Sequence, residues 1–242
     1  TQAQFVLPAL IAVFIAFVGT PLLIKLAPRL GVIDDPAKRR HPAALHTRPI
    51  PRGGGIPLFL AILVTSLIFL PFEQRLFGIL IGAAIVVFTG FLDDRKDINP
   101  YVRLATQFLA AGVVVLSGIG IAFISNPLGG IVDLSQSRFV FDAFGEERDI
   151  WILSAIFGFL WIVGIMNAVS WSSGVDGQLS GFTAIAALVI AILSLQFSAD
   201  ITQWPVTILA AATFGASLGF LPWHIYPQKI MPGFGGATLA GF

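Results

Sequence analysis

The chain has 242 residues, and its composition excludes an ordinary water-soluble domain. Hydrophobic residues make up 56% of it and charged residues only 11%, whereas a soluble domain is about one quarter charged. A fold of this size could not hide so much apolar surface from water. The chain has no cysteine, which excludes a disulfide framework, a thiolate metal site and a cysteine nucleophile. The net charge of +1 carries little information, because in a membrane protein the distribution of Lys and Arg between loops matters more than their sum.

Apolar segments divide the chain into seven predicted membrane spans and the first turns of an eighth. A helix of about 20 mostly apolar residues crosses the hydrocarbon core, and shorter segments suffice where the bilayer thins. The sequence therefore predicts an all-α, polytopic transmembrane helix bundle that forms one integral membrane domain over residues 1–242. The expected spans are Phe5–Leu26, Ile56–Leu70, Leu76–Leu92, Val102–Ile124, Ile150–Val169, Phe182–Phe197, Pro205–Leu221 and Gly235–Phe242.

Two features between and within the spans have structural explanations. The 126–149 segment alternates polar and apolar residues around Ser135–Phe141 and contains Gly129-Gly130, which predicts a small external β-hairpin or folded loop. The small residues of Ala211–Gly219 are typical of closely packed membrane helices.

Basic residues concentrate in alternate loops and predict the orientation. The loops 25–55, 93–103 and 222–234 together hold 11 of the 14 Lys and Arg residues. Because Lys and Arg in short loops resist translocation, these loops are expected to face the cytoplasm. The sequence thus predicts a multi-pass protein of the inner (cytoplasmic) membrane with its N-terminus outside.

The first polar cluster lies in the 31–55 loop. It contains Arg40 and His41, then Arg52 directly before Gly54 and Gly55. Guanidinium groups beside a glycine-rich turn, whose backbone N–H groups can point at an anion, suit the binding of phosphate. The alternative is a positively charged loop that only sets the topology and touches lipid headgroups.

The second cluster follows the third span. Asp93, Asp94 and Asp97 lie within five residues where that span ends, and each carboxylate would cost about 2.5–3.5 kcal/mol if it were drawn to the membrane centre. Oxygen ligands of this kind are preferred by Mg²⁺, which commonly bridges one or two carboxylates and a substrate phosphate. The alternative is a solvated helix end with local basic partners.

Two further clusters interrupt the apolar sequence near the C-terminus. The third contains Asn167, Ser170 and Ser173, followed by Asp176 in a Gly-X-Asp-Gly turn, and offers an amide, hydroxyls and one carboxylate for hydrogen bonding. The fourth contains Lys229 and then Gly233, where glycines lead into the eighth apolar segment. Backbone N–H groups at such a helix start can approach a phosphate. The predicted topology places all four clusters on one face of the membrane.

These blocks resemble the polyprenyl-phosphate N-acetylhexosamine-1-phosphate transferases, a family that includes the UDP-GlcNAc:undecaprenyl-phosphate transferases and the phospho-MurNAc-pentapeptide translocase. The matching blocks are Gly31–Gly55, Phe91–Asp97, Asn167–Gly181 and Gly219–Phe242. The resemblance covers essentially the whole chain, and its first block is closer to the UDP-GlcNAc type.

The resemblance implies transfer of a sugar 1-phosphate, GlcNAc-1-phosphate above all, from a UDP-sugar to undecaprenyl phosphate or another polyprenyl phosphate. UMP is released, and the reaction belongs to cell-envelope polysaccharide synthesis such as that of lipopolysaccharide or teichoic acid. It implies Mg²⁺, or Mn²⁺ in its place, held by Asp93, Asp94 and Asp176, with Asp97 assigned to catalysis beside the first two. The expected partners are the UDP-sugar, the lipid and the membrane, with a homodimer left open and no nucleic acid.

The chain departs from the family pattern at three polar positions. Ser170 and Ser173 stand where the family usually has Asn and Asp, and Phe234 stands where it usually has a metal-ligating Asp. These departures favour one alternative, a catalytically weak or inactive relative that binds lipid phosphate or a partner enzyme. A secondary transporter would need ionisable residues in mid-span, and the spans are nearly free of charge. Family members continue for several more spans, so the chain is expected to be a fragment.

Overall fold

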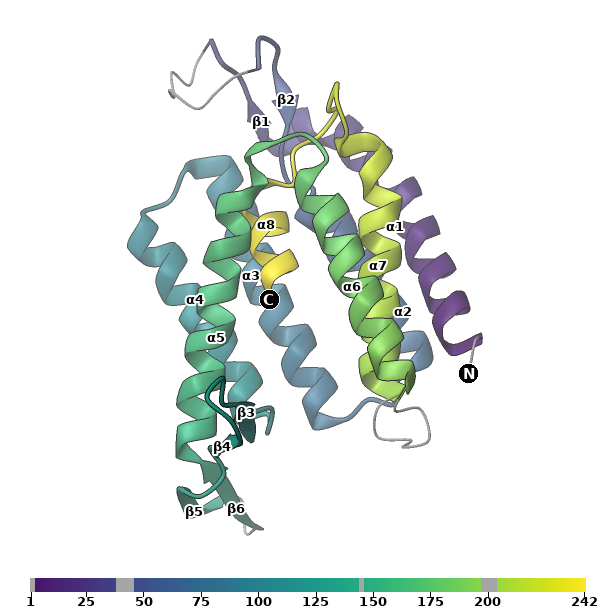
Figure 1. Ribbon diagram of the computed structural model, residues 1–242. Helices are drawn as coiled ribbons and strands as arrows, with labels where there is room; N and C mark the ends of the chain where they lie inside the picture. The colour runs from purple at the N-terminus through teal and green to yellow at the C-terminus, as the bar shows by residue number, and fades with distance from the viewer. Residues whose placement is uncertain (1–2, 38–45, 144–145, 197–203) are drawn as a thin grey trace.

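The computed structural model describes residues 3–37, 46–143, 146–196 and 204–242. These residues form a bundle of helices (Figure 1). Its described helices follow the predicted spans closely, and five of them, α1, α3, α5, α6 and α7, are long and apolar enough to cross a membrane. The prediction of a helical membrane protein is confirmed. The helices are α1 (Ala3–Leu30), α2 (Gly55–Phe69), α3 (Gln74–Lys96), α4 (Pro100–Leu116), α5 (Ile152–Trp171), α6 (Gln178–Gln196), α7 (Trp204–His224) and α8 (Gly233–Gly241).

The expected end of the fourth span is wrong. The fourth span was expected to reach Ile124, but α4 ends at Leu116, and Gly118 follows with a φ of +86° that only glycine adopts easily. The apolar residues after this break form β3 (Phe123–Ser125), which pairs antiparallel with β4 (Ile131–Asp133). A run of apolar residues alone does not distinguish a strand from a helix end.

A second hairpin, β5 (Arg138–Ala143) with β6 (Glu146–Trp151), follows the first, so the predicted hairpin region contains two of them. The start of β6 also means that the fifth helix begins at Ile152 rather than at Ile150. Both hairpins lie at the lower end of the bundle in Figure 1, away from the polar clusters.

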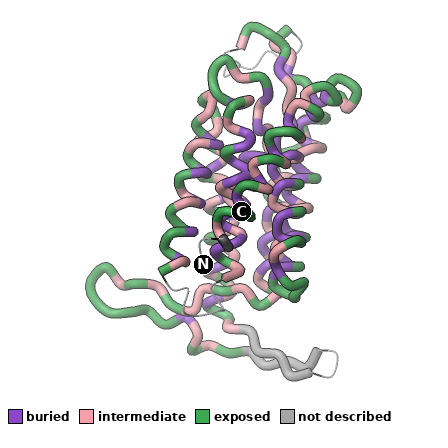
Figure 2. Tube along the Cα trace, turned by 90° about the vertical axis from the view of Figure 1, so that its right-hand side faces the viewer, coloured by how far each residue is buried: buried purple, intermediate pink, exposed green. Residues whose placement is uncertain are grey.

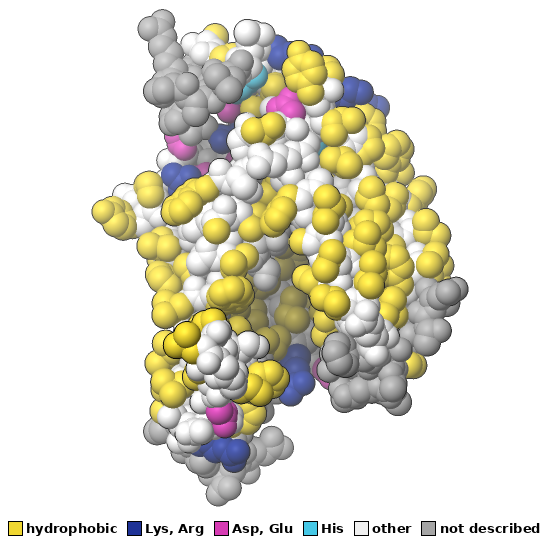
Figure 3. All heavy atoms as spheres, viewed as in Figure 1, with side chains coloured by type: hydrophobic (Ala, Val, Ile, Leu, Met, Phe, Trp, Pro, Cys, Tyr) yellow, Lys and Arg dark blue, Asp and Glu magenta, His cyan; other side chains and the backbone are white. Residues whose placement is uncertain are grey.

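Small residues fill the interior of the bundle, and large apolar side chains cover its outside. Along α1, Ala12 and Ala16 are fully buried, whereas Leu10 is 59% and Phe14 68% exposed. Figure 2 shows the buried residues facing the inside of the bundle, and Figure 3 shows its flanks covered by hydrophobic side chains. A water-soluble protein would reverse this arrangement, so the exposed apolar surface faces lipid.

Glycines allow the closest helix contacts. A Cβ added to Gly215 or Gly219 of α7 would overlap the backbone of α1 at Ala9 or Val13. The predicted packing role of Ala211–Gly219 is therefore confirmed. In the same way, a Cβ at Gly90 of α3 would overlap the backbone of α8 at its start.

The loops that carry the four polar clusters lie at one end of the bundle. Figure 1 shows α1–α2, α3–α4, α5–α6 and α7–α8 each connected at the upper end. The first connection contains the two-stranded pair β1 (Ile33–Asp34) and β2 (Ile50–Pro51), and the third contains the short 3₁₀ helix η1 (Ser172–Gly174). This alternation of helix directions brings segments that are far apart in sequence to the same place.

Replacing Gly215 with Leu is expected to separate α1 from α7. Overpacked sites typically lose about 1–3 kcal/mol, so the thermal unfolding midpoint in detergent should fall. Gly164→Leu is the matched control, because an added Cβ at Gly164 meets no atom within 4 Å. An equal decrease in both variants would contradict the packing role of Gly215.

Candidate active site

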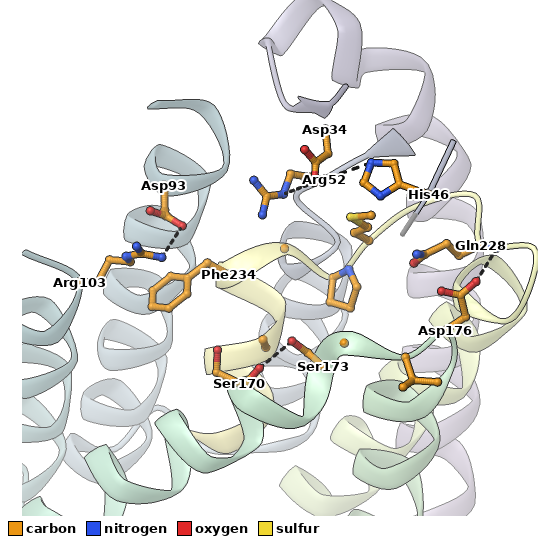
Figure 4. Close-up of a pocket in the computed structure, with 16 residues that line it drawn as sticks. Asp34, His46, Arg52, Asp93, Arg103, Ser170, Ser173, Asp176, Gln228 and Phe234 are labelled. Atoms are coloured by element: carbon orange, nitrogen blue, oxygen red, sulfur yellow. Dashed lines mark hydrogen bonds and ion pairs between the residues drawn. The ribbon is translucent and has the colours of Figure 1, made fainter. Parts of the chain in front are cut away.

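A polar pocket of about 310 Å³ lies where the four loops meet (Figure 4). Each of the four sequence blocks contributes to it, although they are spread over two hundred residues of the chain. The residues that line it are Asp34, His46, Arg52, Asp93, Arg103, Ser170, Ser173, Gly174, Val175, Asp176, Gln228, Met231, Pro232, Gly233, Phe234 and Ala237.

The β1–β2 pair positions Arg52 in the pocket. The N–H of Arg52 donates to the carbonyl oxygen of Val32 over 2.8 Å, which extends the pairing of the two strands by one residue. The Nε atom of Arg52 then lies 3.6 Å from Asp94 Oδ1 and 3.9 Å from Asp34 Oδ2. His46 Nε2 lies 4.0 Å from the same oxygen of Asp34. These distances exceed those of hydrogen bonds, so Arg52 is held between two carboxylates by charge.

A tight turn places Arg103 beside Asp93. Asp97 adopts a left-handed conformation with a φ of +52° and ends α3, and the side chain of Asn99 accepts the N–H of Tyr101 to begin α4. The chain therefore reverses within a few residues, and Arg103 Nη1 donates to Asp93 Oδ2 over 3.3 Å. The other oxygen of Asp93 accepts the N–H of Ile98 over 3.1 Å.

Arg103 is a site residue that the sequence analysis treated only as part of a basic loop. Besides its bond to Asp93, its guanidinium carbon lies 5.2 Å from the centre of the Phe234 ring, within the range of a cation–π contact. The signal that could have identified it is the short Asp97–Pro100 turn, which requires the first turns of α4 to lie beside the end of α3.

Asp94 anchors the start of α8. The N–H of Phe234 donates to Asp94 Oδ1 over 3.1 Å, as expected for a carboxylate at a helix N-terminus. Gly233 has a φ of +69°, and an added Cβ there would overlap the carboxylate of Asp94. The predicted site residue Gly233 must therefore be a glycine, because the carboxylate of Asp94 lies too close for any side chain.

Gly54 and Gly55 are packing residues, and the prediction that their N–H groups point at an anion is wrong. Their N–H groups donate to the carbonyl oxygens of Met231 and Pro232 over 3.1 and 3.0 Å. An added Cβ at Gly54 would come within 2.5 Å of the Phe220 ring. These glycines were predicted to bind phosphate from the charge and glycine content of their loop. Those features do not reveal that carbonyl oxygens of another loop accept their N–H groups.

The third block contributes one wall of the pocket through Ser170, Ser173 and Asp176. The hydroxyl of Ser173 donates to the carbonyl oxygen of Ser170 over 2.7 Å. Asp176 Oδ2 accepts the N–H of Gln228 over 3.3 Å, so it joins the third block to the fourth.

Besides Asp94, Gly54 and Gly55, three more predicted site residues lie outside the lining of the pocket. Asn167 donates through Nδ2 to Gln107 Oε1 over 2.7 Å and so connects α5 to α4. Lys229 is exposed, with its Nζ 5.1 Å from the Trp223 ring. Asp97 is exposed in the turn after α3. The predicted residues Arg40 and His41 lie outside the described residues.

The carboxylates expected to hold Mg²⁺ are not arranged to do so. Among the described residues, no group of three or more His, Cys, Asp or Glu side chains could hold a metal ion. Asp93 and Asp94 each accept a backbone N–H and each lie beside an arginine, whereas Asp176 lies across the pocket from Asp93 (Figure 4). Mg²⁺ requires oxygen ligands at about 2.0–2.1 Å. As placed, the three side chains do not form one set of ligands, because Asp93 and Asp94 each face an N–H donor and a guanidinium group and Asp176 accepts an N–H on the far side of the pocket.

The fold and the site together define a class: a helical membrane protein with a polar pocket of arginine and aspartate at one end of the bundle. The chain belongs to glycosyl transferase family 4, whose model matches residues 76–242.

Curated relatives agree with this family. A Bacillus subtilis protein named "Probable undecaprenyl-phosphate N-acetylglucosaminyl 1-phosphate transferase" is 26% identical over 99% of this chain and 61% of its own length. The decaprenyl-phosphate N-acetylglucosaminephosphotransferase of Mycobacterium tuberculosis is 29% identical over 98% of this chain and 58% of its own length. The phospho-N-acetylmuramoyl-pentapeptide-transferase of Staphylococcus aureus is 27% identical over 96% of this chain and 72% of its own length. The chain thus spans about three fifths of the first two relatives.

Removing the Asn167 side chain is expected to cost stability. Gln107 is only 3% exposed, and an unsatisfied buried amide costs about 1–3 kcal/mol, so Asn167→Leu should lower the thermal unfolding midpoint in detergent. The double variant Asn167→Leu/Gln107→Leu removes both polar groups and should recover most of the loss. A double variant no more stable than the single one would contradict the structural pairing.

Proposed function

We propose that the pocket binds the phosphate of a polyprenyl phosphate and the diphosphate of a UDP-sugar, and that sugar 1-phosphate is transferred between them. The observation that carries the proposal is the meeting of Arg52 and Arg103 in one pocket built from all four blocks. Arginine holds phosphate through paired N–H donors. The relatives support this reaction class, because each is named as a transferase of an N-acetylglucosamine phosphate or of a phospho-N-acetylmuramoyl-pentapeptide.

The position of the pocket supports a lipid acceptor. Three aromatic side chains at this end of the bundle, Tyr101, Trp171 and Tyr226, are 81%, 85% and 84% exposed. Exposed Tyr and Trp collect at the membrane–water interface. A lipid phosphate would lie at that level, while its isoprenoid chain stays among the apolar flanks of the helices.

In the proposed reaction, an oxygen of the polyprenyl phosphate attacks the phosphorus attached to the sugar. A new P–O bond forms, the bond to the UMP oxygen breaks, and UMP leaves. The acceptor phosphate has a second pKa of about 6 and needs little help from a base at neutral pH. Arg52 and Arg103 stabilise negative charge on the transferred group, and Asp94 and Asp93 orient the two guanidinium groups.

The proposal includes the setting of the reaction. GlcNAc-1-phosphate is the proposed transferred group, and cell-envelope polysaccharide synthesis the proposed pathway class. The pocket end is proposed to face the cytoplasm with the N-terminus outside, because the sequence segments 25–55, 93–103 and 222–234 hold 11 of the 14 Lys and Arg residues.

A second candidate is a relative that binds the lipid phosphate without transferring sugar phosphate. Two observations favour it. Phe234, a residue with no ligand atom, lies beside Arg103 in the pocket, and the described carboxylates do not form a metal site. The two candidates share the binding of phosphate and differ in the release of UMP.

Incubating the chain in lipid nanodiscs with UDP-GlcNAc and undecaprenyl phosphate is expected to release UMP. Arg52→Met should lower the rate about 100-fold, the usual cost of removing one donor that stabilises developing charge. Arg95→Met is the matched control, since Arg95 is an exposed arginine of the same end that does not line the pocket. Lipid binding without any UMP release would favour the second candidate, and release unaffected by Arg52→Met would remove the site assignment.

A further inference from the structure

Two of the three aspartates that the family resemblance assigns to a metal, Asp93 and Asp94, each lie beside an arginine. Asp93 accepts a hydrogen bond from Arg103, and Asp94 lies 3.6 Å from Arg52. Both aspartates are buried, with 3% and 6% of their surface exposed. A buried carboxylate requires a compensating positive charge, and in this chain the guanidinium groups supply it.

Phe234 strengthens this arrangement at the position where the family usually has an Asp. Its ring lies 5.2 Å from the guanidinium carbon of Arg103, so the cation is attracted by the ring on one side and by Asp93 on the other. A carboxylate at residue 234 would instead add a third acidic side chain next to Asp93 and Asp94. Phe in place of Asp at this position therefore removes a metal ligand, and it also holds Arg103 beside the position that the metal ion would occupy.

Arg103 can contact a ligand without leaving Asp93. A guanidinium has five N–H donors in a rigid plane, and the bond to Asp93 uses Nη1. The side chain is 27% exposed and lines the pocket. Arg52, with a side chain that is 20% exposed, lines the same pocket from the β2 side. A phosphate between these two arginines would meet positive charge from two directions.

We propose that Arg52 and Arg103 supply the positive charge that a divalent cation would otherwise bring to this pocket, so that lipid phosphate binds without Mg²⁺. The inference rests on the proposed binding of lipid phosphate and holds for either candidate function. The inference assigns Arg103 a direct role in ligand binding. It also accounts for the contact between Phe234 and Arg103, because the ring helps to hold the guanidinium group at the pocket.

The test measures the affinity of the chain in nanodiscs for farnesyl phosphate, a short polyprenyl phosphate, in EDTA and in Mg²⁺. The wild-type chain is expected to bind with the same Kd in both buffers, because its affinity for farnesyl phosphate would not depend on Mg²⁺. Arg103→Met should raise the Kd about tenfold, as expected for a lost charge-assisted hydrogen bond. Arg95→Met should leave the Kd unchanged, and Arg103→Lys, which keeps the charge, should recover part of the loss. Thermal unfolding of each variant in the same nanodiscs shows whether it is folded.

A second variant tests the role of Phe234 directly. Phe234→Asp places a third carboxylate beside Asp93 and Asp94, so farnesyl phosphate should now bind about tenfold more tightly in Mg²⁺ than in EDTA, a coupling typical of linked sites. Phe234→Leu removes the ring without adding charge and should not create this dependence.

The outcomes separate this inference from the proposed function. Wild-type binding that occurs only in Mg²⁺ would overturn the inference and leave the proposed function standing. A wild-type chain that is folded but binds farnesyl phosphate in neither buffer would overturn both. Equal binding in both buffers together with an unchanged Kd for Arg103→Met would show that the arginine is not the cation.

Discussion

The site depends on one carboxylate, Asp94, which joins three separate parts of the chain. It accepts the N–H of Phe234 at the start of α8 and lies beside Arg52 at the end of β2, while its own position belongs to α3. Its side chain is fully buried, so these partners compensate a charge that would otherwise be costly inside the bundle. Loss of Asp94 would release the loop around Arg52 and the start of α8 together.

Glycine makes this junction sterically possible. Gly233 leaves room for the carboxylate of Asp94, and Gly90 and Gly235 let α3 and α8 touch through their backbones. Gly54 and Gly55 bring the start of α2 against the same segment, with their N–H groups bonded to its carbonyl oxygens. The glycines around the pocket thus serve the approach of backbones, and the charges that face a ligand come from side chains.

This division of roles bears on how the pocket would treat a phosphate. Two buried aspartates hold two arginines, and the arginines face the pocket, so negative charge in the wall fixes positive charge toward the ligand. The proposed transferase and the proposed lipid-phosphate binder use this same arrangement. They differ in whether the bound groups are also brought into line for the displacement of UMP.

The sequence alone determined the helices, their alternating direction and the clustering of polar residues at one end, because hydrocarbon thickness and loop charge act on short segments. It also identified Arg52, Asp93, Asp176 and Gly233, which the structure places around one pocket. It could not show that Asn167 pairs with Gln107, that other carbonyls use the N–H groups of Gly54 and Gly55, or that Arg103 joins Asp93. Those outcomes depend on contacts between residues far apart in the chain, or on the angle of a single turn. Only the packed bundle decides such contacts, because hydrogen-bond donors and acceptors are satisfied by whichever groups the tertiary structure brings within reach.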